Sequence, residues 1–114
     1  MTAMSDKDKG LILNIFDHCD RIENAHKRFG DKFETFIDDP DYKDVIMMNL
    51  FQIGESVNFI SDKLKLEIDD IPWHRIYGIR NIIAHAYIKV DEEIIWETSK
   101  NDIPELKKRL EGIV

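Results

Sequence analysis

The stretch from about Asp41 to Lys65 constrains the fold most, because its apolar residues recur at alternating spacings of four and three. Successive residues of an α-helix lie about 100° apart, so this spacing places the apolar side chains along one side of a long central helix. That stripe consists of Ile46, Leu50, Ile53, Val57, Ile60 and Leu64. A second apolar side consists of Met47, Met48, Phe51 and Phe59. A helix that is apolar on two sides either lies deep in a bundle or has a partner beyond its own chain.

Small and polar side chains interrupt this central helix at Gly54, Glu55 and Ser56. A glycine inside a helix costs about 1 kcal/mol relative to alanine, so its expected use is to let another helix pack closely against it. Glu55 and Ser56 either line a functional site or lie exposed or at an interface. Their residue types favour exposure or an interface.

The segments before the central helix carry their own helix signals. A first helix is predicted from about Asp8 to Arg28, with apolar residues at spacings of three and four, and Gly30 ends it. Residues 31–37 have room for one or two helical turns. The sequence Asp38-Asp39-Pro40-Asp41 is a turn with an N-capping signal, which predicts the start of the central helix.

The C-terminal half predicts three further helical segments. One spans 72–85 or 72–87 and begins with proline, which is tolerated there because its missing N–H would have no partner in the first turn. The last helical region is expected as two segments, about 91–100 and 103–112, kinked or separated. The reason is a capping-box pattern that begins at Asp102 and has a proline just inside it.

No stretch alternates apolar and polar residues for long, so the sequence predicts an all-α fold, an up-and-down bundle of four or five helices. We expect a single domain over residues 1–114, with 1–5 disordered. Trp96 is expected to anchor the core, and Cys19 falls on an apolar helix face, where a free cysteine behaves as a small buried hydrophobe.

The charge balance limits the possible partners. The formal net charge is −7 and the pI is near 5.0, which opposes broad, non-specific binding of nucleic acid but suits docking to a basic protein. No apolar run approaches the ~20 residues that span a bilayer, and no signal-peptide pattern is present, so a cytoplasmic protein is expected. The four histidines lack the spacing of metal ligands and cysteine pairs are absent, so neither a metal nor a cofactor is expected.

The helix that begins near residue 72 has one apolar and one polar side. The apolar arc, expected to face the core, holds Ile76, Ile79, Ile82, Ile83 and Ala86. On the polar side, Asn81 and His85 are four residues apart and stack on one face, and the long side chain of Arg80 can lean toward the same space. A guanidinium, an imidazole and an amide together suit an anionic ligand such as a phosphodiester. Such residues can also be merely solvated, and composition alone favours that alternative.

Arg80, four residues, His85, one residue and Tyr87 form a pattern that resembles the Arg-x4-His-x-Tyr motif of the HEPN-domain ribonuclease toxins, the HepT-like family. The resemblance extends from about Asp8 to the C-terminus. It includes, in order and spacing, Ile53-Gly54-Glu55, Ile71-Pro72-Trp73, Gly78-Ile79-Arg80-Asn81, Val90-Asp91, Ile95-Trp96-Glu97-Thr98 and Asp102-Ile103-Pro104-Glu105-Leu106-Lys107.

The resemblance implies the toxin of a HEPN/MNT toxin–antitoxin pair, a metal-independent RNA endonuclease that acts as a homodimer. Arg80 would stabilise charge on phosphorus, and His85 would act as acid or base, because an unperturbed histidine titrates near neutral pH. Since the motif offers one histidine per chain, two copies across a two-fold axis would share both roles. Asn81 would position the RNA substrate or His85.

The resemblance also implies how such a toxin is controlled. A partner nucleotidyltransferase, the antitoxin, would transfer AMP to Tyr87 and block the site. The alternative is a non-catalytic HEPN subunit that binds nucleotide or serves as an adaptor for a nucleotidyltransferase.

Overall fold

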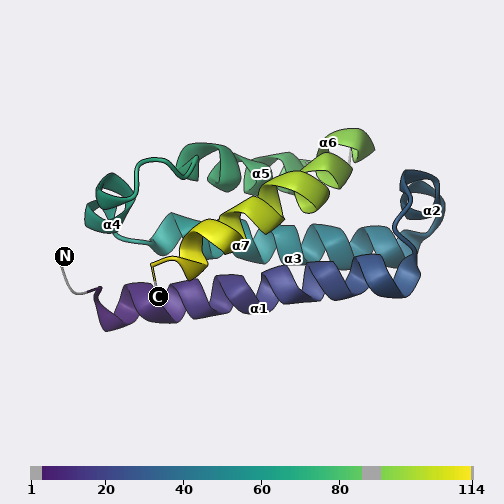
Figure 1. Ribbon diagram of the computed structural model, residues 1–114. Helices are drawn as coiled ribbons and strands as arrows, with labels where there is room; N and C mark the ends of the chain where they lie inside the picture. Colours follow the sequence, from purple (N-terminus) through teal and green to yellow (C-terminus); the bar gives the residue numbers. More distant parts are fainter. Residues whose placement is uncertain (1–3, 86–90, 114) are drawn as a thin grey trace.

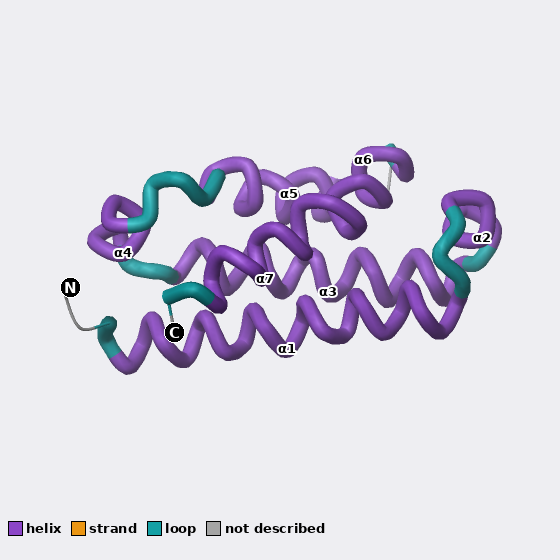
Figure 2. The backbone as a smooth tube through the Cα atoms, viewed as in Figure 1, coloured by secondary structure: helices purple, strands orange, loops and turns teal. Residues whose placement is uncertain are grey.

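The protein is an all-α bundle in a computed structural model that describes residues 4–85 and 91–113, without the side chain of His85. Figure 1 shows the three main helices α1 (Asp6–Phe29), α3 (Pro40–Phe59) and α5 (Trp73–His85) running up and down, with α3 packed against both of the others. Two short helices, α2 (Phe33–Asp38) and α4 (Asp62–Glu67), lie in the connections. Figure 2 shows that the remaining described loops are short and that no strand is present in this part of the chain.

The last helical region is one continuous rod that crosses the bundle and contacts α1 (Figure 1). It consists of α6 (Glu92–Glu97), a π-helical turn η1 (Thr98–Asp102) and α7 (Ile103–Glu111). The predicted break is therefore a π-helical turn within a continuous helix, and the predicted cap is wrong. The side chain of Asp102 caps nothing, because its carboxylate pairs with Arg75 at 3.0 Å.

Local hydrogen bonds explain where the other helices begin and end. The Ser5 side chain caps α1 by accepting from the Asp8 amide, and Gly30 ends that helix with a φ of 112°, a backbone conformation that favours glycine. Asp39 caps α3 by accepting from the amides of Asp41 and Tyr42, as its turn predicted.

The predicted end of the central helix near Lys65 is wrong, because α3 ends at Phe59 and α4 starts a new helix at Asp62. Ser61 caps α4 by accepting from the Leu64 amide. The buried carboxylate of Asp8, on α1, accepts hydrogen bonds from the Ser61 amide at 2.9 Å and from its hydroxyl at 2.6 Å. This contact between segments distant in sequence fixes the break.

The predicted apolar stripe is confirmed as the centre of the core, since all six of its residues are at most 5% exposed. On the second apolar side of α3, Met47 and Phe51 are half-buried, whereas Met48 and Phe59 are 67% and 54% exposed. Cys19 is buried as expected, and burial raises the pKa of its thiol to about 12.

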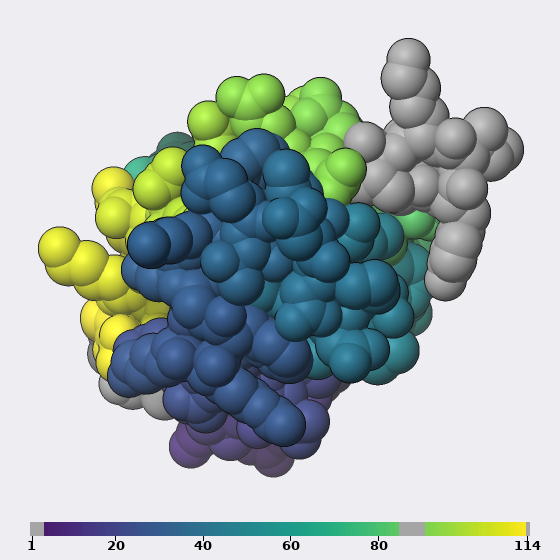
Figure 3. Space-filling model, turned by 90° about the vertical axis from the view of Figure 1, so that its right-hand side faces the viewer, coloured from purple at the N-terminus to yellow at the C-terminus, as the bar shows by residue number. Residues whose placement is uncertain are grey.

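An aromatic cluster closes the end of the bundle near α2. Trp96 packs within 6.1 Å, between ring centroids, of four other rings, which confirms it as a core anchor; the rings belong to His26, Phe33, Phe36 and Tyr42. Figure 3 looks onto this end, where α2 (dark blue) lies beside α6 (green). Within the residues described, no helix is long and apolar enough to cross a membrane.

Candidate active site on helix α5

Helix α5 turns one side toward α3. Ile76, Ile79 and Ile83 are buried, as the apolar arc predicted, but Ile82 is 40% exposed, so its predicted place facing the core is wrong. The helix start is fixed by Trp73, which is buried and donates from its indole N–H to the backbone oxygen of Ile68 at 2.8 Å. The buried side of α5 is therefore narrower than the sequence predicted, and the apolar side chain of Ile82 reaches the surface two residues after Arg80.

Arg80 lies at a close approach of α5 to α3. A Cβ on Gly54 would be 3.0 Å from the Cβ of Arg80, closer than neighbouring side chains normally come. The expected use of Gly54, close packing by another helix, is therefore confirmed. The backbone of α3 brings the Arg80 guanidinium next to the following residue, Glu55.

Glu55 is the ion-pair partner of Arg80. The two side chains are 29% and 34% exposed, so the pair is half-buried and less screened by water than a surface pair. The sequence favoured exposure or an interface for Glu55 and did not predict its ion pair with Arg80. Ser56, in contrast, is buried and accepts a hydrogen bond from Asn14 at 2.8 Å.

Aromatic rings complete the surroundings of the Arg80 guanidinium. Its central carbon lies 5.7 Å from the centre of the Phe51 ring and 5.9 Å from that of Tyr77, within the range of cation–π attraction. The guanidinium also donates to the Tyr77 hydroxyl at 3.4 Å, a long contact. Sequence reasoning gave lining of a functional site as one alternative for Glu55 but favoured exposure or an interface, and it did not single out Tyr77.

The other predicted site residues are placed less completely. Asn81 is exposed on α5, one residue after Arg80, and His85 is the last residue of that helix, with its side chain outside the described part. Tyr87 lies outside the described residues. Arg80 and Asn81 are thus consecutive residues of α5 with Arg80 half-buried and Asn81 exposed, and a site that they share with His85 stays a prediction.

A groove of about 660 Å³ runs beside Arg80, between α3 and the C-terminal part of α5. Phe51 belongs both to this groove and to the surroundings of Arg80; the other lining residues are Asp44, Met47, Met48, Gln52, Ile83 and Ala84. Ala84 contributes a small side chain to this lining. An apolar groove next to a cation can take a base or a partner's side chain while an anionic group meets the guanidinium.

The chemistry available at this site follows from Arg80. In the described structure its charge is balanced by Glu55, so a bound phosphodiester would have to share or replace that carboxylate. Among the described residues no three potential metal ligands gather, at this site or elsewhere. A guanidinium next to two aromatic rings suits the stabilisation of charge on a phosphoryl group.

Comparison with known proteins places the chain in a family. A family model described as "Ribonuclease HepT-like" matches residues 15–113. The chain is 35% identical over 110 residues to "Probable ribonuclease HepT" of Thermococcus cleftensis, and the aligned region covers 96% of this chain and 98% of that protein. It is 33% identical over 106 residues to "Putative RNase MJ1216" of Methanocaldococcus jannaschii, covering 93% and 86% of the two chains. No solved structure matches this chain.

Proposed function

This chain belongs to the HepT-like ribonuclease family, and on that premise we propose that it is a metal-independent RNA endonuclease with Arg80 and His85 as its catalytic residues. The observation that carries the proposal is the position of Arg80, half-buried between Phe51 and Tyr77 on the motif helix. A guanidinium held in this way is oriented before the substrate arrives, which lowers the cost of stabilising the transition state.

The proposed reaction uses the RNA itself as the nucleophile. The 2′-oxygen forms a bond to phosphorus while the bond from phosphorus to the 5′-oxygen breaks, which leaves a 2′,3′-cyclic phosphate and a free 5′-hydroxyl. One histidine takes the proton of the 2′-hydroxyl and another gives a proton to the leaving oxygen. Arg80 stabilises the additional negative charge on the phosphoryl oxygens, and Asn81 positions the substrate.

The need for two histidines leads to a homodimer. Each chain supplies one His85, so acid and base come from two copies across a two-fold axis. The exposed apolar side chains Met48 on α3 and Ile82 on α5, on the two helices that border the groove beside Arg80, support an interface there. Light scattering at micromolar concentration tests this, and a monomer would contradict it.

Control of the activity is proposed to come from a nucleotidyltransferase antitoxin. This partner would transfer AMP from ATP to the Tyr87 hydroxyl, forming a phosphodiester bond and releasing pyrophosphate. The net charge of −7 suits a basic docking surface on such a partner. The acceptor is proposed from the motif alone.

A second candidate is a non-catalytic adaptor subunit of a nucleotidyltransferase. Two observations favour it: the chain is acidic overall, and Glu55 already balances the charge of Arg80. Both would weaken RNA binding.

The deciding experiment incubates a labelled RNA with the purified protein in EDTA. The ribonuclease cleaves it and leaves 2′,3′-cyclic phosphate ends, whereas a 2′-deoxy substrate stays intact. The Arg80→Ala variant is inactive, and Arg75→Ala, a matched arginine on the same helix, stays active. An RNA that is cleaved equally by the parent and by Arg80→Ala would point to contamination and favour the adaptor.

A further inference from the structure

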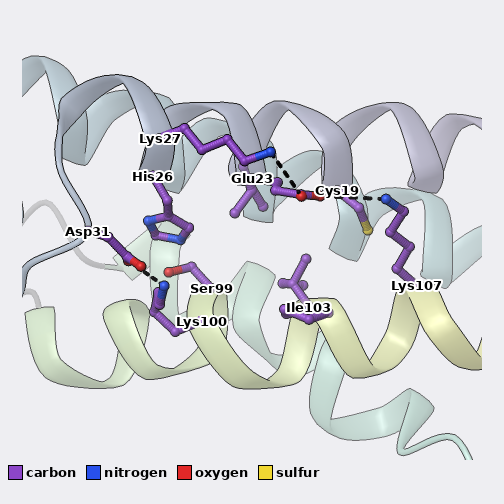
Figure 4. A pocket seen from close by; sticks show the side chains of 11 residues that line it. Cys19, Glu23, His26, Lys27, Asp31, Ser99, Lys100, Ile103 and Lys107 are labelled. Carbon is purple, nitrogen blue, oxygen red and sulfur yellow. Dashed lines mark hydrogen bonds and ion pairs between the residues drawn. The ribbon is translucent and has the colours of Figure 1, made fainter.

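A second pocket lies away from α5, between the second half of α1 and the rod formed by η1 and α7. It has a volume of about 340 Å³, and Figure 4 shows it between the two helices. All of its described lining residues belong to α1, to the turn that follows α1, and to η1 and α7. Ile22 of α1 and Ile103 of α7 contribute apolar side chains to its walls. The pocket is separate from the surroundings of Arg80, and nothing in the proposed nuclease reaction uses it.

His26 gives this pocket a buried polar atom. His26 is only 8% exposed, and its Nδ1 lies 2.6 Å from the Tyr42 hydroxyl. Its Nε2 is buried and makes no well-formed hydrogen bond in the part of the chain that the structure describes, although the Ser99 backbone lies close enough to the ring to favour its protonated form. Figure 4 shows the imidazole directed from α1 toward Ser99 and the pocket. A buried polar atom without a partner is costly unless something else satisfies it.

Because the His26 ring is neutral, its Nε2 is available to a ligand in either tautomer. Burial lowers the pKa of His26, and the Lys100 ammonium lowers it further, against the opposite effects of Asp31 and the Ser99 backbone. The neutral ring bonds Tyr42 through Nδ1, either as acceptor or as donor. Nε2 then offers either an N–H or a lone pair to the pocket.

Charged side chains from both walls surround the pocket. Three lysines and two acids line it, and Asp20, which is not a lining residue, pairs with Lys107 at 2.8 Å; the lining residues are Lys27, Lys100, Lys107, Glu23 and Asp31. The acids are already engaged: Asp31 pairs with Lys100, and Glu23 lies 3.4 Å from Lys27 and 3.6 Å from Lys107. An added anionic group would find ammonium groups from both walls within one small space.

The wall opposite α1 has unusual backbone geometry. The five residues Thr98–Asp102 form the π-helical turn η1, and two of them, Thr98 and Ser99, are buried. The Ser99 hydroxyl donates to the Trp96 backbone oxygen at 2.7 Å, which leaves it engaged within its own helix. Single π-helical turns inside α-helices are rare and frequently occur at functional sites. Here the turn carries Ser99 and Lys100 into the lining of the pocket.

We propose that this pocket binds a small phosphate monoester with an aromatic or apolar body. The phosphate meets the lysine rim, the body lies between Ile22 and Ile103, and its edge makes a hydrogen bond with His26 Nε2. The volume lies within the usual range for small-molecule sites, and the combination of apolar walls with few polar groups is typical of them. A mononucleotide and a non-nucleotide aryl phosphate share this chemistry. The proposal goes beyond the ribonuclease activity and does not depend on it.

The test is an NMR titration of the full chain with AMP, phenyl phosphate, adenosine and inorganic phosphate, followed on the histidine ring resonances. The His26 signals, assigned with His26→Gln, are expected to shift saturably with AMP or phenyl phosphate, while the exposed His74 stays unchanged. Adenosine lacks the phosphate and inorganic phosphate lacks the apolar body. Each should therefore bind at least about tenfold more weakly than AMP or phenyl phosphate. Binding of phenyl phosphate without AMP would identify a non-nucleotide ligand; binding of both would identify the phosphate with a planar body as the recognised unit.

A matched pair of variants shows whether the pocket is responsible. Lys100→Gln removes a lining ammonium and is expected to weaken binding about tenfold, the loss of one charge-assisted contact. Lys108→Gln makes the same charge change on an exposed residue of α7 that is not among the lining residues, and should bind like the parent. An unchanged His26 signal with all four compounds overturns the proposal. So does equal weakening by both variants, or a shift of His74 and His85 in place of His26.

Discussion

The Cβ of Arg80 lies 3.0 Å from the position that a Cβ on Gly54 would occupy, so the glycine lets α5 bring Arg80 against α3. The same approach puts the guanidinium beside Glu55 and Phe51. Because this contact involves the β-carbon of Arg80, a larger residue at position 54 cannot be accommodated by rotating the end of a flexible side chain. The geometry of the proposed site therefore depends on Gly54, a residue without a side chain that could take part in the reaction.

Substitution of this glycine tests that dependence. In Gly54→Ala, the gain in helix propensity of about 1 kcal/mol is offset by crowding that typically costs about 1–3 kcal/mol. Thermal unfolding should occur at or below the temperature of the parent, and RNA cleavage should fall because Arg80 is displaced. Gly10→Ala is the control, since nothing lies within 4 Å of its added Cβ, and it should be more stable than the parent. A Gly54→Ala protein that is both stabilised and fully active would contradict the argument.

Glu55 is expected to position Arg80 and to restrain its charge. In Glu55→Gln the amide keeps the shape of the side chain but loses its charge, so RNA should bind more tightly and KM should fall. Because Arg80 is less well aligned, kcat should fall as well, by about tenfold, which corresponds to about 1.4 kcal/mol of transition-state stabilisation. Steady-state kinetics measure the two effects separately. The exposed Glu93→Gln on α6 serves as control, and equal kinetics in the two variants would leave Glu55 with a structural role only.

The proposed catalytic pair gives a sharper prediction. Arg80→Ala and His85→Ala should each abolish RNA cleavage and the growth arrest that it causes. Arg80→Ala leaves Glu55 half-buried without its cation, so a loss of about 1 kcal/mol in unfolding free energy is expected, far from enough to unfold the protein. Urea unfolding checks this. If either variant is inactive only because it has melted, the residue is structural.

The sequence predicted the helices because each depends on local features. The stripe from Ile46 to Leu64 repeats at helical spacing, and Gly30 and Asp39 act within a few residues of themselves. The break after Phe59 could not be predicted in this way. Ser61 can cap a helix from local geometry, but its partner Asp8 is 53 residues away, and only the packing of α1 against α3 brings the two together.

The candidate site likewise combines features that depend on the local sequence with contacts between segments distant in the sequence. The sequence made Arg80 and Asn81 candidates from their place on one helix. For Glu55 it left two alternatives open, and only the contact between α3 and α5 shows its carboxylate paired with Arg80. Asp102 looked like a helix cap from its neighbours alone. Its carboxylate instead pairs with Arg75 of α5, a competing partner that the sequence pattern cannot show.

The buried carboxylate of Asp8 should make stability depend on pH in acid. Burial alone would raise the pKa of Asp8, but hydrogen bonds from Ser61, with Ser5, hold it below its ordinary value of 3.8. Since the folded pKa is the lower one, the stabilisation is present above pH 3.8 and is lost as the pH falls through the folded value. Asp8→Asn should lose about 1–3 kcal/mol at neutral pH, the cost of unmatched buried hydrogen bonds.

The measurement is urea unfolding of the parent and Asp8→Asn between pH 7 and pH 3. The difference between them should shrink only in the most acidic part of that range. His26, whose pKa is lowered by burial, also destabilises the fold in acid, but it does so in both proteins and cancels in the difference. Asp6→Asn, exposed in the same first turn of α1, should behave like the parent. A constant difference down to pH 3 would show that Asp8 acts without its charge.

The last prediction separates RNA cleavage from its control. Tyr87→Phe removes only the phenolic oxygen, so the fold and the roles proposed for Arg80 and His85 are kept and RNA cleavage should persist. The partner nucleotidyltransferase should no longer modify the protein, because the acceptor oxygen is gone. Intact mass after incubation with that partner, ATP and magnesium measures this: the parent should gain one or more AMP units of about 329 Da each, and the variant none. If the variant gains the same mass, another residue is the acceptor. If the parent gains none with its true partner, inhibition is by binding alone, and the adaptor alternative is strengthened.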